Sequence, residues 1–209
     1  MFNRNAKYFL RNEGDKYYDR NKSDRPDYKK ELLSKKISDC INNNKNKKNI
    51  RVLEVGCGNA QRLIYLKQKF PSANFYGIDP SSKAIKKIIK NVSLKKSTAD
   101  RIPFKKNFFD IIIYGFCLYL VDDKSLFKVI SEAERVSKSD SWIIVYDFYS
   151  KEVKYRQYKH NKKILIRKMD CSKFFSWCPY YKIKIFKKFK YKNKKKDFLS
   201  VVCIKKKVD

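Results

Sequence analysis

Histidine, glycine and proline are scarce in this sequence, which has one histidine, five glycines and five prolines among its 209 residues. A site built from several histidines is therefore excluded, and no internal repeat is present. The six cysteines include no Cys-x-x-Cys pair, and the single histidine, His160, cannot form a histidine cluster. Neither a metal site nor a disulfide framework is encoded, so we expect no metal.

Long hydrophobic runs are also missing. The longest apolar stretch, residues 108–121, is interrupted by Asp110 and is too short to cross a bilayer. Residues 1–10 carry charges and lack the apolar centre of a signal peptide. We therefore expect no membrane span and a soluble, reducing, cytoplasmic setting.

Acidic residues are few, with 21 Asp and Glu against 52 Lys and Arg, which gives a net charge of +31. Such a charge is typical of proteins that bind nucleic acids or anionic membranes. Lysine greatly outnumbers arginine, however, and the basic residues are spread along the whole chain, with the densest runs at 45–48, 187–196 and 205–207. This composition favours a solvated surface, and a nucleic-acid partner stays an alternative.

The hydrophobic pattern predicts one α/β domain. From residue 50 onward, short apolar runs alternate with amphipathic segments, and the last two runs have no helix between them, so they form an antiparallel pair. The expected fold is a doubly wound, mostly parallel seven-stranded sheet, Rossmann-like, ending in an antiparallel hairpin. Strands are expected at 50–55, 73–79, 92–100, 108–116, 141–149, 181–191 and 197–206, and helices at 28–41, 59–70, 81–89, 122–138 and 170–175.

The two ends of this pattern differ from its middle. Residues 1–30 show no clean period and predict an irregular arm with at most one short helical turn. Residues 150–169 are read as a polar crossover. We divide the chain into an N-terminal arm and helix, residues 1–45, and a single domain, residues 46–209.

The end of the first strand, Glu54-Val55-Gly56-Cys57-Gly58, indicates a ligand site. Two glycines allow a sharp turn and let a ligand approach the backbone where a Cβ would collide. In a doubly wound sheet, ligands bind past the carboxyl ends of the strands. Asp79 ends the second strand at the spacing expected of a carboxylate that binds ribose hydroxyls. These positions predict a cofactor that contains adenosine.

A dinucleotide is the weaker interpretation. The third glycine of a G-x-G-x-x-G motif is replaced by Gln61. Glu54 lies two residues before Gly56, and its carboxylate repels a phosphate but attracts the sulfonium and ammonium charges of S-adenosylmethionine.

Three segments together resemble class I S-adenosylmethionine-dependent methyltransferases, over about residues 50–148. They read VLEVGCGNA at 52–60, FYGIDPS at 75–81 and TADRIPFKKNFFDIII at 98–113. The resemblance implies that the loop of Glu54, Gly56, Cys57 and Gly58 holds the methionine end of the cofactor. It implies that Asp79, with Pro80, binds the ribose. One departure is Ala60, where many members have a third glycine.

The same resemblance extends to the adenine. It implies that Asp100 binds the adenine amino group, with Arg101 and Ile102 beside the ring. The flanks, GDKYYDRN at 14–21 and residues 147–175, are similar to methylases associated with pseudaminic acid and other surface-sugar biosynthesis. They imply a sugar or sugar-nucleotide acceptor, and Tyr17, Tyr18 and Arg20 are then expected to close the arm over the cofactor as a lid.

Candidate catalytic residues are Tyr119 and His160. Tyr119 follows the fourth strand, where many relatives have a histidine, but a phenol with a pKa of about 10 is a poor base unless the site lowers that value. His160 has a pKa suited to proton transfer near neutrality. Simple packing of Tyr119 and simple exposure of His160 remain alternatives. An anionic acceptor would be bound by basic and aromatic residues of the crossover, namely Tyr155, Arg156, Tyr158, Arg167 and Lys168.

Three functions are open at this point. The first is methylation of a small molecule, in which alignment of acceptor and cofactor does most of the work. The second is methylation of RNA, favoured by the charge alone, although Cys117 lacks the preceding proline of RNA cytosine methyltransferases. The third is an inactive scaffold that binds cofactor, suggested by Tyr119 in place of histidine.

Overall fold

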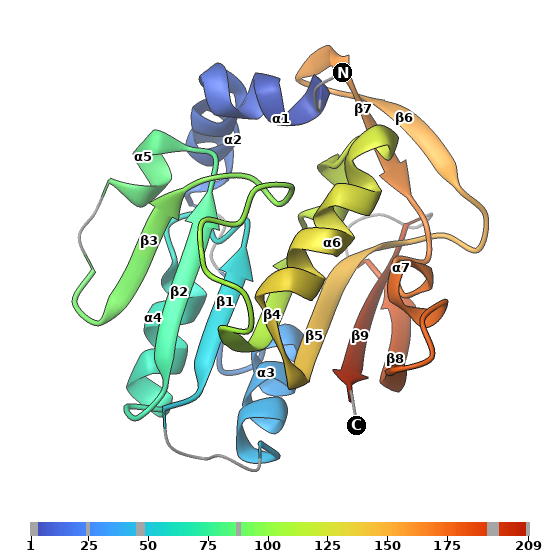
Figure 1. The fold of residues 1–209 in the computed structure, drawn as a ribbon. Helices are drawn as coiled ribbons and strands as arrows, with labels where there is room; N and C mark the ends of the chain where they lie inside the picture. The colour runs from blue at the N-terminus through green and yellow to red at the C-terminus, as the bar shows by residue number, and fades with distance from the viewer. Residues whose placement is uncertain (1–3, 24–25, 45–48, 87–88, 192–196, 208–209) are drawn as a thin grey trace.

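The computed structural model describes residues 4–23, 26–44, 49–86, 89–191 and 197–207. Its centre is a seven-stranded sheet with the strand order β3-β2-β1-β4-β5-β9-β8. The first five strands are parallel, and β9 is antiparallel to both β5 and β8. The expected fold class is confirmed (Figure 1). The strands are β1 (Arg51–Val55), β2 (Asn74–Asp79), β3 (Val92–Lys96), β4 (Phe109–Gly115), β5 (Ser137–Tyr149), β8 (Tyr181–Lys190) and β9 (Phe198–Lys206).

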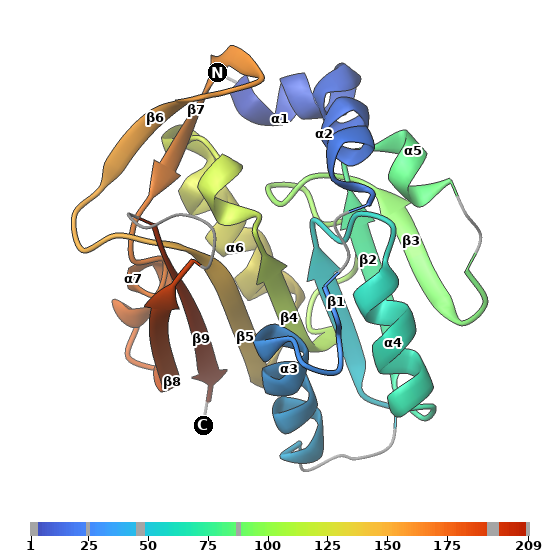
Figure 2. The same cartoon turned by 180° about the vertical axis from the view of Figure 1, so that it is seen from behind.

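Helices cover both faces of this sheet. In Figure 1 α6 (Leu126–Val136) and α7 (Lys173–Ser176) lie in front of the sheet, and Figure 2 shows α3 (Leu32–Asn42) and α4 (Gln61–Lys69) on the other face. Each face has its own buried core. Because side chains alternate along a strand, Leu53 and Val55 of β1 join the α6 core, whereas Val52 joins the α3 and α4 core. This alternation also decides where the functional side chains of β1 point.

The prediction for the N-terminal arm was wrong. The arm is helical from Arg4 to Asn21, as α1 (Arg4–Tyr8), a π-helical turn (Phe9–Glu13) and α2 (Gly14–Asn21). Phe9 packs against Tyr17 and Tyr158, with ring centroids 6.1 and 6.4 Å away. The surface that stabilises the arm lies far along the chain, so a local pattern could not reveal it.

The crossover prediction was also wrong. Residues 150–169 contain a two-stranded antiparallel sheet, β6 (Lys154–Tyr158) and β7 (Asn161–Lys168), which lies beside the arm above the main sheet (Figure 1). Most side chains of β6 are exposed, so this strand lacks the alternating pattern by which a half-buried strand is recognised in a sequence.

Several boundaries moved by a few residues. The helix expected at 81–89 is only α5 (Ser82–Ile85), capped by the Ser81 hydroxyl, and residues 87–88 of that prediction lie outside the described residues. The third strand ends at Lys96 rather than residue 100, and β5 begins at Ser137 rather than residue 141. Among the described residues, no helix combines the length and apolar character needed to cross a membrane.

Candidate active site

The loop after β1 has the backbone that its glycines predict. Gly56 and Gly58 have φ angles of +76° and +53°, in the left-handed region that favours glycine. The amides of Gly56 and Cys57 donate to the carbonyl oxygen of Ile78 over 2.8 and 3.1 Å, which ties the loop to β2. Ala60 also adopts a positive φ of 58°. The backbone therefore keeps the left-handed turn at the position where the resemblance implies a third glycine.

Asp79, at the end of β2, is oriented by backbone donors. Its Oδ2 accepts from the Gly58 amide over 2.9 Å, and its Oδ1 accepts from the Ser81 amide over 2.8 Å. Burial raises the pKa of Asp79 to about 6, although both hydrogen bonds act in the opposite direction. Each carboxylate oxygen keeps a lone pair for a further donor.

A pocket opens beside these residues. Gly56, Asp79, Pro80 and Asp100 line it. The arm contributes Ala6, Phe9, Gly14 and Tyr17, and the segment after β4 contributes Phe116, Cys117, Leu120 and Val121. The pocket thus combines a mostly apolar wall with two carboxylates, as small-molecule sites commonly do.

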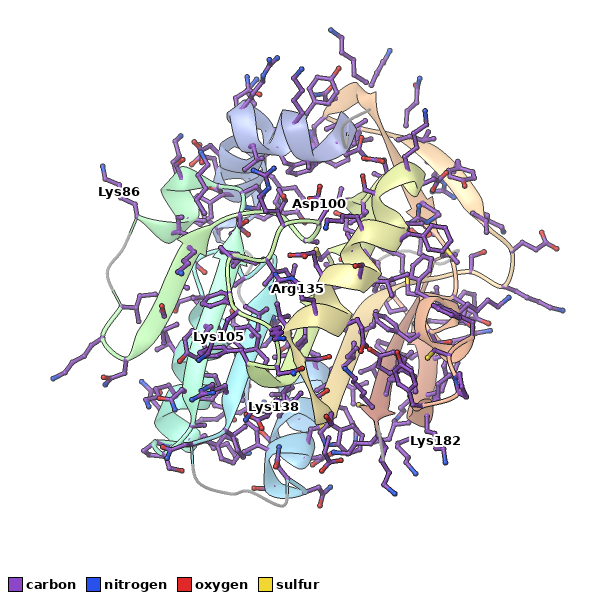
Figure 3. All side chains as sticks on the ribbon, viewed as in Figure 1. Lys86, Asp100, Lys105, Arg135, Lys138 and Lys182 are labelled. Carbon is purple, nitrogen blue, oxygen red and sulfur yellow. The ribbon has the colours of Figure 1, made fainter. Side chains whose placement is uncertain are left out.

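Asp100, which lines the pocket, has one carboxylate oxygen without a hydrogen-bond donor in the described part of the chain. Its Oδ1 is buried and has no hydrogen-bond partner among the described residues. A buried acceptor without a donor is costly, so an amino group in the pocket would satisfy it. Figure 3 shows Asp100 below the N-terminal helices. Of the residues expected beside the ring, Arg101 is exposed and does not line the pocket, and Ile102 is buried in the core.

Glu54 and Cys57 point away from the pocket. Glu54 shares the strand face of Val52, and its carboxylate forms a buried ion pair with Arg62 of α4, which also binds Glu31 over 2.8 Å. Burial raises the pKa of Glu54 to about 7, against the effect of Arg62. The sulfur of Cys57 faces Gly77, where an added Cβ would approach it to 2.6 Å. Neither residue lines the pocket.

The two candidate catalytic residues lie outside the pocket wall. The Tyr119 hydroxyl is 3.3 Å from the Tyr17 hydroxyl, and only Tyr17 lines the pocket. Burial raises the pKa of Tyr17 to about 12 and raises that of Tyr119 as well, which opposes either phenol acting as a base. His160 is exposed in the β6–β7 turn, with its ring 5.4 Å from that of Tyr158.

Tyr18 and Arg20 do not line the pocket either. The Arg20 guanidinium binds the carboxylate of Glu13 over 2.5 Å and the hydroxyl of Tyr158 over 2.9 Å. Arg20 therefore holds the arm to the β6–β7 hairpin. Instead of Tyr18, the neighbouring Tyr17 faces the pocket.

The residues expected to bind an anionic acceptor divide into two groups. The Tyr155 hydroxyl donates to Asp123 over 2.8 Å, Arg167 is ion-paired with the same carboxylate, and Tyr158 binds Arg20 as described above. Arg156 and Lys168, by contrast, line a second hollow beside Tyr149 at the end of β5.

Sequence reasoning missed the contribution of Phe9, Gly14 and Phe116. For Gly14 the available signal was the glycine itself. In the structure an added Cβ there would lie 2.6 Å from the Phe9 carbonyl oxygen and 3.1 Å from the Ser81 amide. A glycine in the arm thus marks its close approach to the loop after β2. Phe9 and Phe116 carry no such mark in the sequence.

Comparison with known proteins agrees with this geometry. A family model described as a methyltransferase domain matches residues 46–202. The chain belongs to this methyltransferase family. No curated protein matches it.

Solved structures share the fold at low identity. A Burkholderia thailandensis 1,6-didemethyltoxoflavin N1-methyltransferase, with its acceptor and S-adenosylhomocysteine bound, is 11% identical, with a TM-score of 0.74 over 100% of this chain and 92% of that one. A Haloferax volcanii methyltransferase in complex with a methyltransferase activator is 13% identical, with a TM-score of 0.67 over 92% and 96%. A Methanosarcina mazei S-adenosylmethionine-dependent methyltransferase is 17% identical, with a TM-score of 0.62 over 77% and 93%.

These results confirm the coarse expectation of a class I methyltransferase with S-adenosylmethionine as its cofactor. The two carboxylates fit that cofactor. Asp100 Oδ1 has no donor among the residues that the structure describes and could accept from an amino group, and Asp79 at the end of β2 could accept from ribose hydroxyls. The resemblance to surface-sugar methylases stays a prediction.

Proposed function

We propose that this chain transfers the methyl group of S-adenosylmethionine to a small-molecule acceptor. The observation that carries the proposal is one pocket that holds both the backbone-oriented Asp79 and the unpartnered Asp100 Oδ1. When bound, S-adenosylmethionine supplies an electrophilic methyl group on a sulfonium.

The residues of the pocket have separable tasks in this proposal. Asp79 accepts hydrogen bonds from the ribose hydroxyls, and Asp100 accepts one from the adenine amino group. The Gly56–Gly58 turn leaves room for the methionine end. Apolar side chains of the arm and of the segment after β4, such as Phe9 and Leu120, exclude water.

Alignment is the main catalytic contribution that we propose for this site. In-line methyl transfer gains most from holding the acceptor against the sulfonium, and a base is needed only for an acceptor that must lose a proton. Tyr17 and Tyr119 have raised pKa values, so we propose that Tyr17 orients the acceptor and that Tyr119 positions the Tyr17 hydroxyl. We assign His160 no chemical step because it is exposed and does not line the pocket.

The arm is proposed to be the lid over this site, with residues 1–45 as lid and helix and residues 46–209 as the methyltransferase domain. Four arm residues line the pocket. Asp15 accepts from the Ser81 hydroxyl over 2.6 Å and from the Lys83 amide over 3.0 Å. The Asn5 side chain donates to the carbonyl oxygens of Leu120 and Leu165 over 2.8 and 3.0 Å. These bonds tie the lid to both sides of the site.

A small acceptor is supported by two considerations. The Burkholderia neighbour acts on 1,6-didemethyltoxoflavin, a small molecule, and the flanking segments resemble surface-sugar methylases. RNA methylation is supported only by the net charge, and Figure 3 shows Lys86, Lys105, Lys138 and Lys182 on separate parts of the molecule. This arrangement fits a solvated surface better than one RNA track. An inactive scaffold is the remaining alternative.

The experiment has two steps. Calorimetry with S-adenosylhomocysteine should show binding to wild type that is strongly weakened in Asp79→Ala. Metabolite extracts incubated with the protein and methyl-labelled cofactor should then yield a labelled small molecule detectable by mass spectrometry. Absence of any binding heat refutes the cofactor assignment. Binding without any labelled product supports the scaffold, and labelled RNA supports the nucleic-acid alternative.

A further inference from the structure

A second hollow, of about 430 Å³, lies at the end of β5, between the β6–β7 hairpin and the β8–β9 pair. Its size falls within the range of roughly 300–1,000 Å³ that small-molecule sites occupy. Five basic side chains line it, and they come from four segments of the chain, namely Lys151, Lys154, Arg156, Lys168 and Lys188. The cationic groups therefore converge on one concavity instead of pointing apart.

Most of this charge is uncompensated. Only Lys168 has an ion-pair partner in the hollow, because its amine binds Asp197 over 2.6 Å. Lys151, Lys154, Arg156 and Lys188 have no ion-pair partner among the described residues, and the one further carboxylate in the lining is Glu152. An anion in the hollow would thus meet several cations that the protein leaves unneutralised.

The strand register brings like charges together. Lys154 of β6 stands directly opposite Lys168 of β7. Like charges at such a pair destabilise a hairpin, and a bound anion would relieve the repulsion. Lys154 and Arg156 share one strand face, whereas Tyr155 between them points to the other and binds Asp123. The alternation of β6 thus directs its two cations to the same side.

Aromatic rings lie under the cations. The Lys188 amine is 5.0 Å from the Tyr149 ring centroid and 4.7 Å from that of Phe198. Tyr149 and Phe198 both line the hollow. A ligand that carries a ring as well as an anionic group would find a surface for each.

One aromatic side chain separates the hollow from the cofactor pocket. The Lys168 amine lies 4.6 Å from the Phe148 ring centroid, and Phe148 lies 5.5 Å from the Phe116 ring, which lines the cofactor pocket. Both cavities therefore border the same aromatic cluster at the carboxyl end of β5. An acceptor that lay against this cluster would have its anionic end in the hollow.

We propose that the hollow of Lys151, Lys154, Arg156 and Lys188 binds the phosphate or diphosphate group of the methyl acceptor. Lysine amines bind phosphate as point charges, and the Arg156 guanidinium offers paired donors that match phosphate oxygens. A single carboxylate would use fewer of these cations, so a multiply charged group fits best. Naming the ligand as the acceptor rests on the proposed methyltransferase function, but the anion site itself does not.

The test uses inorganic pyrophosphate as the probe, titrated into the full-length protein at fixed ionic strength. Wild type should bind it, and the double variant Lys154→Gln/Arg156→Gln should weaken binding by about tenfold or more. The matched control is Lys182→Gln/Lys184→Gln, which removes the same charge from exposed positions of β8, with Lys182 visible at the far end in Figure 3. The control should change the affinity by less than about twofold.

Both double variants should bind S-adenosylhomocysteine as wild type does, which shows that they fold and separates this test from the proposed function. Equal weakening by the two double variants, or no pyrophosphate binding by wild type, overturns the site. A single-stranded RNA oligonucleotide that binds more tightly than pyrophosphate, and depends on Lys154 and Arg156, reassigns the hollow to RNA.

The link to the acceptor needs a separate measurement. Metabolite extract treated with phosphodiesterase and phosphatase before incubation should lose its labelled methyl product. An unchanged product in the treated extract refutes the assignment of the hollow to the acceptor, whatever the pyrophosphate titration gives.

Discussion

The backbone amide of Gly58 donates a hydrogen bond to Oδ2 of Asp79 over 2.9 Å, joining the turn after β1 to the end of β2. A second bond, from the Ser81 amide to Oδ1, fixes the carboxylate from its other side. The protein thus orients the proposed ribose acceptor with its own backbone. This orientation reduces the freedom that the side chain loses on binding.

Asp79→Ala should weaken S-adenosylhomocysteine binding by about 10- to 100-fold, because charge-assisted bonds to the ribose are lost. The affinity of Asp79→Asn should lie between those of wild type and Asp79→Ala. Its amide keeps one acceptor oxygen but places an amino group near a backbone donor. Calorimetry measures both. Asp140→Ala, an exposed carboxylate on β5, is the control and should bind normally. An Asp79→Ala protein with wild-type affinity would contradict the ribose assignment.

Asp100 is expected to recognise the adenine amino group. Wild type should prefer S-adenosylhomocysteine over S-inosylhomocysteine, which carries an oxygen in place of that amino group, by about tenfold or more. Asp100→Ala should lose this preference, because the unpartnered Oδ1 is gone. Competition binding with the two ligands gives the ratio for each protein. A preference that survives in Asp100→Ala would place the adenine elsewhere.

The sequence was sufficient to predict the main sheet and the carboxyl ends of β1 and β2, which carry the site. Glycines at 56 and 58 have the positive φ angles that their positions imply, and Asp79 stands beside them. These features are local, or they follow from the rule that parallel strands end at one edge. Glu54 shows the limit of this reasoning. Its side chain lies on the strand face toward α4, where it pairs with Arg62, and the sequence alone did not reveal this pairing.

The arm and the β6–β7 hairpin could not be predicted, because they stabilise each other. Asn5 bonds to Leu165, Arg20 bonds to Tyr158, and Phe9 packs on Tyr158, all across more than half of the chain. Neither segment has a periodic pattern strong enough on its own. Such long-range pairing becomes visible only in the folded structure.

Gly14→Ala should loosen the proposed lid. An added Cβ would lie 2.6 Å from the Phe9 carbonyl oxygen within the arm, and 3.1 and 3.2 Å from the backbone of Ser81 and Pro80, so the arm has to rearrange where it contacts the loop after β2. We expect faster dissociation of S-adenosylhomocysteine, by roughly tenfold, because the lid then covers the pocket less well. Stopped-flow displacement measures the rate. Lys16→Ala, an exposed change in the same helix, is the control; an unchanged rate in Gly14→Ala would count against a lid.

Asp147, a fully buried carboxylate on β5, should make the stability of the protein depend on pH. It accepts hydrogen bonds from the amides of Phe148 and Tyr119 over 2.7 and 3.2 Å. Burial nevertheless raises its pKa from 3.8 to about 7. Between these two values the folded protein holds a proton that the unfolded chain has released. The stabilisation is therefore complete below about pH 4 and is lost as the pH rises through about 7.

Asp147→Asn should remove this dependence, because the amide cannot ionise and keeps one acceptor oxygen for the backbone. From pH 5 to pH 7.5 the free energy of unfolding of the variant, measured relative to that of wild type, should rise by an amount on the order of 2 kcal/mol. Urea denaturation at the two pH values measures the difference. Glu54 and Asp79 also have raised pKa values and remain in both proteins, so their contributions cancel in the comparison. Asp140→Asn, at an exposed position, should show no such change, and a constant gap between wild type and Asp147→Asn would mean that Asp147 ionises in the folded state at its ordinary pKa.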